Sequence, residues 1–401
     1  EPEFSLTGHT REVTGMAISP DDKRIASGAY DNMIIIWNLE EQRQEFSLSG
    51  HTAELTCVKF SPDGKSLASG AYDNMIKIWN LGEQREEFSL SGHTAAVKDV
   101  VFTLDGRKLI SGSDDSTIKV WDLAKRCEEY TLSGHTAELT SVVLTPDGKK
   151  LLSAGYDSTI KLWDLQERRE EFSLVGHIGI IWGIAISPDS KRVVSVSDGS
   201  IKVWSMEGQY EEFSFSGQTG TAWCVNITPD GKKVVFGSYD KTLRVWNLEE
   251  QREEYALTGH GGEVYCMAIS SDGKRVISGG GDQRILVWDI IHMTPKEYRQ
   301  FIMAFRSEGR ISNVGRSKPP FSVLNLGFLH SAVYCENIPM LSNIFQQWRE
   351  RDYYQPLKCD CTGLNPIETA AAFKNGKLLK RLLRYVTTLP IGYIEQPGRT
   401  F

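Results

Sequence analysis

The sequence contains no apolar run of about 18 residues, the length that a membrane-spanning helix requires, and no signal-peptide pattern at its start. We therefore expect a cytoplasmic chain without a membrane span. Because the sequence opens with Glu1-Pro2-Glu3 rather than methionine, we also expect it to be part of a larger protein. Targeting signals or membrane spans would then lie outside it.

Cysteine is too irregularly placed to form a disulfide framework, since the chain has seven, an odd number. Cys57, Cys224 and Cys266 share one position in the repeat described below, beside apolar residues, and are expected to be buried thiols. Cys359 and Cys361 lack a second pair of ligands for zinc. No Gly-rich phosphate loop and no Cys-x-x-Cys motif is present, so we expect neither a metal nor a cofactor.

The charge is unevenly distributed along the chain, whose net charge is −7. Residues 1–290 carry 30 lysines and arginines against 44 aspartates and glutamates, whereas residues 291–401 carry 15 against 8. Nucleic acids are bound largely through Lys and Arg on their phosphates, so no nucleic-acid partner is expected for the acidic first part. The basic remainder suits either an acidic partner or an ordinary solvated surface.

What the chain has in abundance is one repeated stretch, of which residues 50–79 are an example. A Gly-His or Gly-Gln pair opens each of seven copies and a tryptophan closes it, with a spacing of 42 residues except for one step of 41. The copies open at Gly8, Gly50, Gly92, Gly134, Gly176, Gly217 and Gly259. A period in this range is typical of a solenoid, a propeller or an array.

Within a copy, apolar residues follow a period of two, which predicts short β-strands. In the second copy, strand-like runs are separated by clusters of turn residues such as Pro62-Asp63-Gly64. Four strands in 42 residues correspond to one propeller blade. Seven copies therefore predict an all-β, seven-bladed β-propeller over residues 1–290.

The pattern resembles the WD-repeat β-propeller family. The resemblance rests on the Gly-His openings, on an aspartate six residues before each closing tryptophan, and on the pairs Trp121-Asp122, Trp163-Asp164 and Trp288-Asp289. Residues 4–6 match the fourth strand of later copies, and the last copy stops after its third strand. We expect residues 1–7 to supply the outer strand of the last blade and so to close the ring.

The remaining residues, 291–401, lack the repeat and predict a smaller α-helical segment. Residues 291–306 predict a connecting helix, and the Gly- and Pro-containing residues 307–322 predict a linker.

Residues 323–401 contain two stretches that resemble degenerate ankyrin repeats. His330 and Ala332 match part of the Thr-Pro-Leu-His-x-Ala signature in the first, and Pro366 and Ala370 match part of it in the second. Two repeats are fewer than a stable stack usually needs.

A set of Ser, His, Asp and Trp recurs in every copy except the sixth. In the second copy the set is His51, Ser69, Asp73 and Trp79. Such residues could form a hydrolase triad, but the resemblance implies a structural network in which buried polar groups satisfy one another. Leaving one unpaired costs roughly 1–3 kcal/mol. An active site would not be copied six times, so we interpret the set as structural.

Two copies depart from this pattern. The sixth has Gln218 in place of His and Phe236 in place of Ser, and the fifth is one residue shorter before Asp198. We expect these two blades to be locally softer.

In propellers of the WD family, partners commonly dock on the face that holds the Gly-His loops and the turns between the second and third strands. We expect partner-binding residues at the positions of this face where the copies differ. The acidic candidates are Glu12, Glu54, Glu138 and Glu263. The aromatic and aliphatic candidates are Tyr30, Tyr72, Tyr156, Ile180, Trp182, Trp223, Tyr239 and Tyr265.

These residues favour a protein or peptide partner with basic side chains, held by ion pairs and cation–π contacts. The competing interpretation is that the aromatic residues pack between blades. We thus expect a non-catalytic protein–protein interaction scaffold. One alternative is a regulatory module of a larger signalling or membrane protein. A propeller hydrolase or lyase would need acids, histidines or metal ligands clustered at the central channel, and the sequence shows no such cluster.

Overall fold

The computed structural model describes residues 2–216 and 220–290. The expected connecting helix (291–306), linker (307–322) and ankyrin-like segment (323–401) therefore lie outside the described residues, as does Gln218.

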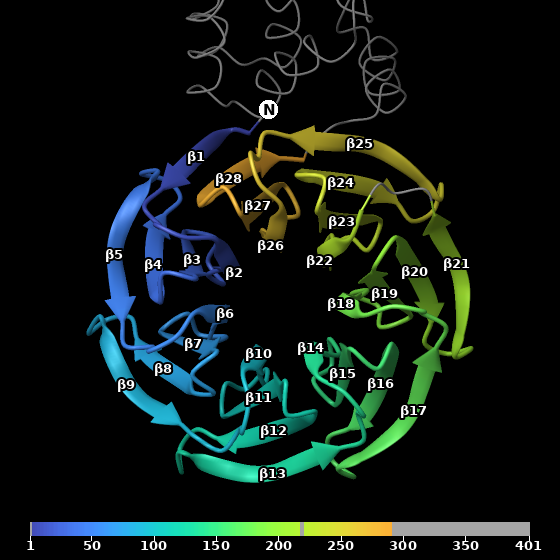
Figure 1. The fold of residues 1–401 in the computed structure, drawn as a ribbon, viewed down its shortest axis with the longest axis horizontal. Coiled ribbons are helices and arrows are strands. Elements are labelled where there is room, and N and C mark those ends of the chain that lie inside the picture. The colour runs from blue at the N-terminus through green and yellow to red at the C-terminus, as the bar shows by residue number, and fades with distance from the viewer. Residues whose placement is uncertain (1, 217–219, 291–401) are drawn as a thin grey trace, which may run out of the picture. The chain divides into compact units, whose positions relative to one another are not determined.

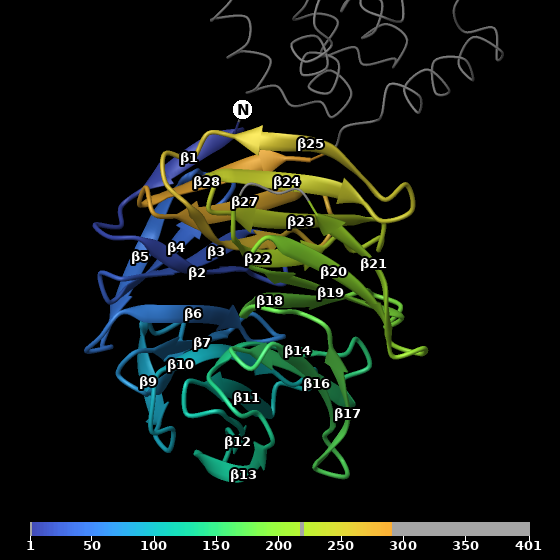
Figure 2. The ribbon, with the colours of Figure 1, turned by 45° about the vertical axis from the view of Figure 1, so that its right-hand side comes forward.

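Seven four-stranded antiparallel sheets surround a central axis in the unit Glu1–Ile290 (Figure 1). This arrangement confirms the seven-bladed all-β propeller. Within each blade the first strand of a copy lies nearest the axis and the fourth lies on the outside (Figures 1 and 2).

The first three blades contain β2 (Val13–Ile18), β3 (Arg24–Ala29), β4 (Met33–Asn38), β5 (Arg43–Ser49); β6 (Leu55–Phe60), β7 (Ser66–Ala71), β8 (Ile76–Asn80), β9 (Arg85–Leu90); and β10 (Val97–Phe102), β11 (Lys108–Ser113), β12 (Thr117–Asp122), β13 (Cys127–Ser133). The next three contain β14 (Leu139–Leu144), β15 (Lys150–Gly155), β16 (Thr159–Asp164), β17 (Arg169–Val175); β18 (Ile181–Ile186), β19 (Arg192–Ser197), β20 (Ser200–Ser205), β21 (Tyr210–Ser216); and β22 (Ala222–Ile227), β23 (Lys233–Ser238), β24 (Thr242–Asn247), β25 (Arg252–Thr258). The seventh contains β26 (Val264–Ile269), β27 (Arg275–Gly280), β28 (Arg284–Asp289) and β1 (Phe4–Thr7).

The hydrophobic core lies between neighbouring blades. One cluster joins Ile34 and Ile36 of the first blade to Leu55, Leu67 and Trp79 of the second, all nearly inaccessible to solvent. Equivalent clusters fill the other gaps between blades. Each blade is therefore stable only beside its neighbours, as in other repeat proteins.

A β-bulge interrupts the pairing of the two inner strands in every blade. In the second blade Leu55 pairs with Ala71 and Cys57 with Gly70, so that Thr56 between them has no partner in the ladder. A bulge commonly redirects the side chain of the extra residue. The unpaired residues are Thr14, Thr56, Lys98, Thr140, Trp182, Trp223 and Tyr265.

The two ends of the inner strands define two faces. We call the upper face the one where the inner strands begin and where the turns between second and third strands lie; the pairing of Leu55 with Ala71 brings these two segments together. The lower face holds the turns between first and second strands. In one of these turns Gly64 has a φ of +68°, and Asp63 accepts hydrogen bonds from the Ser61 hydroxyl (2.6 Å) and the Lys65 N–H (3.1 Å).

The N-terminal strand β1 pairs antiparallel with β28, so the two ends of the repeat array share one sheet (Figure 1). The Glu3 N–H donates to the Val287 carbonyl (2.7 Å), and the Leu6 side chain is buried in the core between the seventh and first blades. Without β1, the backbone edge of β28 would be open to solvent.

Deletion of residues 1–7 should markedly lower the midpoint of thermal unfolding. Loss of the buried Leu6 side chain alone should cost about 3 kcal/mol, so Leu6→Ala should reproduce part of the effect. Ser5→Ala changes an exposed side chain of the same strand and should melt like the wild type. An unchanged melting curve after the deletion would contradict a closing role for β1.

Candidate interaction surface

A buried hydrogen-bonded network holds the upper loops of most blades. In the second blade the Trp79 indole N–H donates to the Ser69 hydroxyl (2.8 Å), which lies 2.7 Å from Nε2 of His51. Nδ1 of His51 lies 2.8 Å from Asp73, and Asp73 also accepts the Thr52 N–H (3.0 Å). This chain of contacts fits a histidine protonated on Nδ1, with the Ser69 hydroxyl donating to Nε2.

The electrostatics of the network favour a neutral histidine beside a charged aspartate. Burial lowers the pKa of His51, although Asp73 acts in the opposite direction. Burial tends to raise the pKa of Asp73, but hydrogen bonds from the Thr52 N–H and from His51 outweigh it and hold the pKa below its usual value. Ser69 is fully buried and engaged by Trp79, so a substrate has no access to its hydroxyl. The network therefore ties the Gly-His loop, the turn and two strands of the blade together.

The bulge residues form a second feature of the upper face, and their roles differ between blades. In the first, second and fourth blades a threonine hydroxyl donates across to the next blade: Thr14 to the Leu55 carbonyl (2.6 Å), Thr56 to that of Val97 and Thr140 to that of Ile181 (both 2.5 Å). The fifth, sixth and seventh blades carry aromatic residues at this position. These three blades thus have a large, partly exposed ring where the first, second and fourth have a hydrogen bond between blades.

Four of the candidate rings form a continuous series across the fourth to seventh blades. Tyr156 contacts Trp182 with ring centroids 5.6 Å apart, Trp182 contacts Trp223 at 4.4 Å, and Trp223 contacts Tyr265 at 5.7 Å. We call these four residues the aromatic arc. The rings do pack against one another between blades, yet none of the four is buried, and Tyr156 is 38% exposed.

The first three blades present a different surface, because cations of the chain itself cover their rings. The Arg11 guanidinium lies 5.7 Å from the Tyr30 ring and 3.3 Å from Glu54. The Lys98 ammonium lies 4.5 Å from the Tyr72 ring and 3.6 Å from Asp114. The Arg11 guanidinium also lies 3.7 Å from Glu12, so two of the expected binding tyrosines and two of the glutamates are already engaged.

The remaining candidates lie beside the arc. Glu138 and Glu263 form no ion pair with a lysine or arginine among residues 2–216 and 220–290. Burial raises the pKa of Tyr265, and the negative charges of Glu263 and Glu12 raise it further. The environment of this ring is therefore negatively charged. Tyr239 is 56% exposed, and Ile180 is half-buried.

The fifth blade breaks the structural network at its turn aspartate. Asp198 does not reach His177; instead its carboxylate accepts the Trp182 indole N–H (2.9 Å) and the Thr221 hydroxyl (3.0 Å) of the sixth blade. Nδ1 of His177 lies 3.3 Å from the Ser200 hydroxyl. The missing residue in this copy shortens the turn, and the carboxylate that elsewhere holds a loop here holds an arc residue.

Sequence reasoning missed Asp198 in this role and also missed two exposed aliphatic residues. Ile178, on the loop between β17 and β18, is fully exposed, and Val175, the last residue of β17 in the fourth blade, is 71% exposed. Ile178 stands where Thr10, Thr52, Thr94 and Thr136 stand in earlier copies, so a comparison of copies at this position contains the signal. Exposed aliphatic side chains therefore lie where the chain passes from the fourth blade into the fifth.

The sixth blade lacks the network in another way. Phe236 replaces the serine and is fully buried, and the Trp246 indole N–H has no hydrogen-bond partner within the described part of the chain. Trp246 packs instead against Phe215, with centroids 4.1 Å apart.

Seven similar blades, a buried network repeated around the ring and a variable upper face together define a repeat propeller of the WD type. The chain belongs to the WD domain, G-beta repeat family, whose sequence model matches residues 1–38, 42–80, 84–122, 126–164, 168–205, 210–247 and 251–289. A comparison with curated proteins gave no match.

Two further kinds of feature, a membrane-spanning helix and a metal site, are not seen among the described residues. Over residues 2–216 and 220–290, no helix is long and apolar enough to cross a membrane. The same residues hold no group of three or more His, Cys, Asp or Glu side chains that could bind a metal ion.

The stability of the propeller should depend on pH through His177. Its burial lowers its pKa from 6.5 to about 4, so below pH 6.5 the unfolded chain binds a proton that the folded chain does not. The free energy of unfolding should fall on the order of 2 kcal/mol between pH 7 and pH 5 from this residue. Urea unfolding at both pH values measures it. The difference in unfolding free energy between pH 7 and pH 5 should become smaller in His177→Gln than in His93→Gln. An equal difference in the wild type and both variants would contradict the role given to His177.

Asp198→Ala should release the Trp182 indole while costing only about 1 kcal/mol of stability. Fluorotryptophan NMR should show a shifted and broadened Trp182 signal. Asp73→Ala is the matched change in the second blade; it removes the partner of His51 and the Thr52 N–H and should destabilise more, without moving the Trp182 signal. An unchanged Trp182 signal in Asp198→Ala would show that the carboxylate does not hold the ring.

Proposed function

We propose that this protein is a non-catalytic interaction scaffold whose aromatic arc binds a polypeptide segment carrying a lysine or arginine next to apolar side chains. Propellers of this family generally serve as protein-interaction scaffolds. The choice of the arc as the binding site is supported by its position: it lies on the upper face, mainly at positions where the last three copies differ in sequence from the earlier ones.

The preference for a basic residue is supported by the chain's own use of its upper face. Arg11 and Lys98 lie over Tyr30 and Tyr72, each with a carboxylate nearby. No cation of the described residues lies over a ring of the arc. A partner's lysine or arginine would reproduce this arrangement on the arc, with Glu138 or Glu263 as the counter-charge.

The preference for apolar neighbours is supported by the fifth blade. Ile178 and Ile180 stand four and two residues before Trp182, and Ile178 is fully exposed. Exposed aliphatic residues beside aromatic anchors are typical of protein interfaces, where aromatic residues near the centre contribute most of the binding energy. Since Asp198 fixes the Trp182 indole, the ring is held before a partner arrives, which reduces the entropy lost on binding.

Selection of a displayed peptide library on the immobilised full chain tests the proposal. Enriched peptides should carry lysine or arginine beside apolar residues, and binding should weaken at higher salt. Trp182→Ala combined with Trp223→Ala should weaken their binding by at least about 2 kcal/mol, or roughly 30-fold.

Tyr210→Ala is the control, because it removes an exposed aromatic ring from the outer strand β21 and should leave peptide affinity unchanged. Thermal melts of both variants show whether the fold is retained. Enrichment of acidic peptides, or full affinity in a well-folded double variant, would refute the proposal.

A further inference from the structure

A cavity of about 380 Å³ opens at the lower end of the central channel, opposite the aromatic arc. Its walls come from the first, second, third, sixth and seventh blades, and most of the lining residues are apolar, with Ile18, Phe102, Ile227 and Ile269 among them. Small-molecule sites are typically of a few hundred Å³, mostly apolar and equipped with a few polar groups.

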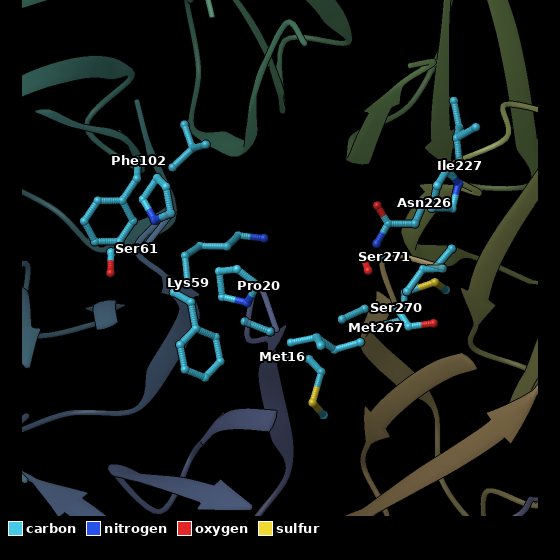
Figure 3. A pocket seen from close by; sticks show the side chains of 18 residues that line it. Met16, Pro20, Lys59, Ser61, Phe102, Asn226, Ile227, Met267, Ser270 and Ser271 are labelled. Carbon is cyan, nitrogen blue, oxygen red and sulfur yellow. The ribbon is translucent and has the colours of Figure 1, made fainter. Parts of the chain in front are cut away.

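Two polar side chains enter this cavity from opposite sides. Figure 3 shows the Lys59 ammonium and the Asn226 carboxamide pointing toward one another across the opening. Both occupy the same position of their copies, three residues after the bulge. At that position the other five copies have only alanine or valine: Ala17, Val101, Val143, Ala185 and Ala268.

The other polar side chains of the lining are already engaged. The Ser61 hydroxyl donates to Asp63 (2.6 Å), that of Ser270 donates to Asp272 (2.6 Å), and that of Ser271 donates to Asp22. Among the described residues, by contrast, Lys59 forms no ion pair, and the Asn226 side chain has no hydrogen-bond partner. One cation and one amide are thus left available in an apolar cavity.

One candidate counter-charge for Lys59 is Asp99, on the inner strand of the third blade. Its oxygens are satisfied elsewhere: they accept the Val142 N–H (3.1 Å), the Ser141 hydroxyl (3.3 Å) and the Val100 N–H (3.0 Å). Burial raises the pKa of Asp99, while the charge of Lys59 counteracts this from a distance. Lys59 therefore influences Asp99 without being bound to it.

We propose that this lower mouth of the channel binds a small organic monocarboxylate with an apolar body. The carboxylate accepts a charge-assisted hydrogen bond from Lys59 and a second one from the Asn226 amide N–H, and the apolar body packs against the isoleucines and Phe102. A single cation in apolar walls suits one negative charge better than a phosphate, and it repels cationic ligands. This site is separate from the aromatic arc and does not depend on the function proposed for it.

Octanoate titrated into the full chain by calorimetry tests the proposal, with octanol and octylamine as matched ligands. Octanoate should bind and the other two should bind at least roughly tenfold more weakly, a factor that corresponds to about 1.4 kcal/mol. Lys59→Met removes the charge at similar length and should lower octanoate affinity by a similar factor. Lys59→Arg should retain most of the affinity, and Asn226→Ala should lose part of it.

Lys65→Met is the control variant, since Lys65 is an exposed lysine of the turn that follows the same strand and does not line the cavity. If octanol binds as tightly as octanoate, or if Lys59→Met binds octanoate unchanged, the cavity only accumulates apolar molecules and the proposal fails. The proposal also fails if octanoate does not bind the wild type. In that case a lower melting temperature of Lys59→Met would show that Lys59 serves as a counter-charge for Asp99. Asn226→Ala and Lys59→Arg keep the test decisive should Lys59→Met not fold.

Discussion

The buried contact between a tryptophan indole and a serine hydroxyl is the constraint on which the rest of each regular blade depends. In the second blade it fixes the third strand to the second, and through His51 and Asp73 it ties both strands to the Gly-His loop and to the turn of the upper face. Because the serine is fully buried, neither partner can exchange its hydrogen bond for one with water. The upper loops are therefore tied by hydrogen bonds to the core beneath them.

The fifth blade shows that this network can be divided. The contacts of Trp204 and His177 with Ser195 remain, at 2.7 and 2.6 Å, so the blade keeps its place in the ring. Only the last link, from histidine to the turn aspartate, is lost. A loss of one residue has thus released a carboxylate for use on the surface while the buried part of the network persists.

Much of the fold could be predicted from the sequence, because a period of 42 residues carries the turn residues, the core alternation and the buried polar set in every copy. The positions of the candidate site could also be predicted, since they are where the copies differ. The partners of those residues could not. The contact of Arg11 with Glu54 joins two blades, and the destination of the Asp198 carboxylate depends on Trp182 and on Thr221 of the next blade. Such contacts follow from the curvature of the ring, which no single copy encodes.

The bulge of each inner strand has a consequence for how this surface can change. The inner strand of each blade forms a single ladder, with the second strand, and the residue at the bulge has no partner in that ladder. Strand register therefore does not depend on the identity of this residue. Seven such positions surround the mouth of the channel, and in this chain they already hold threonine, lysine, tryptophan and tyrosine. In the first, second and fourth blades the threonine hydroxyl at this position also donates to the next blade, so a substitution there removes a contact between blades. The side chain at the bulge can nevertheless change the chemistry of the upper face without changing the pairing of the strand that carries it.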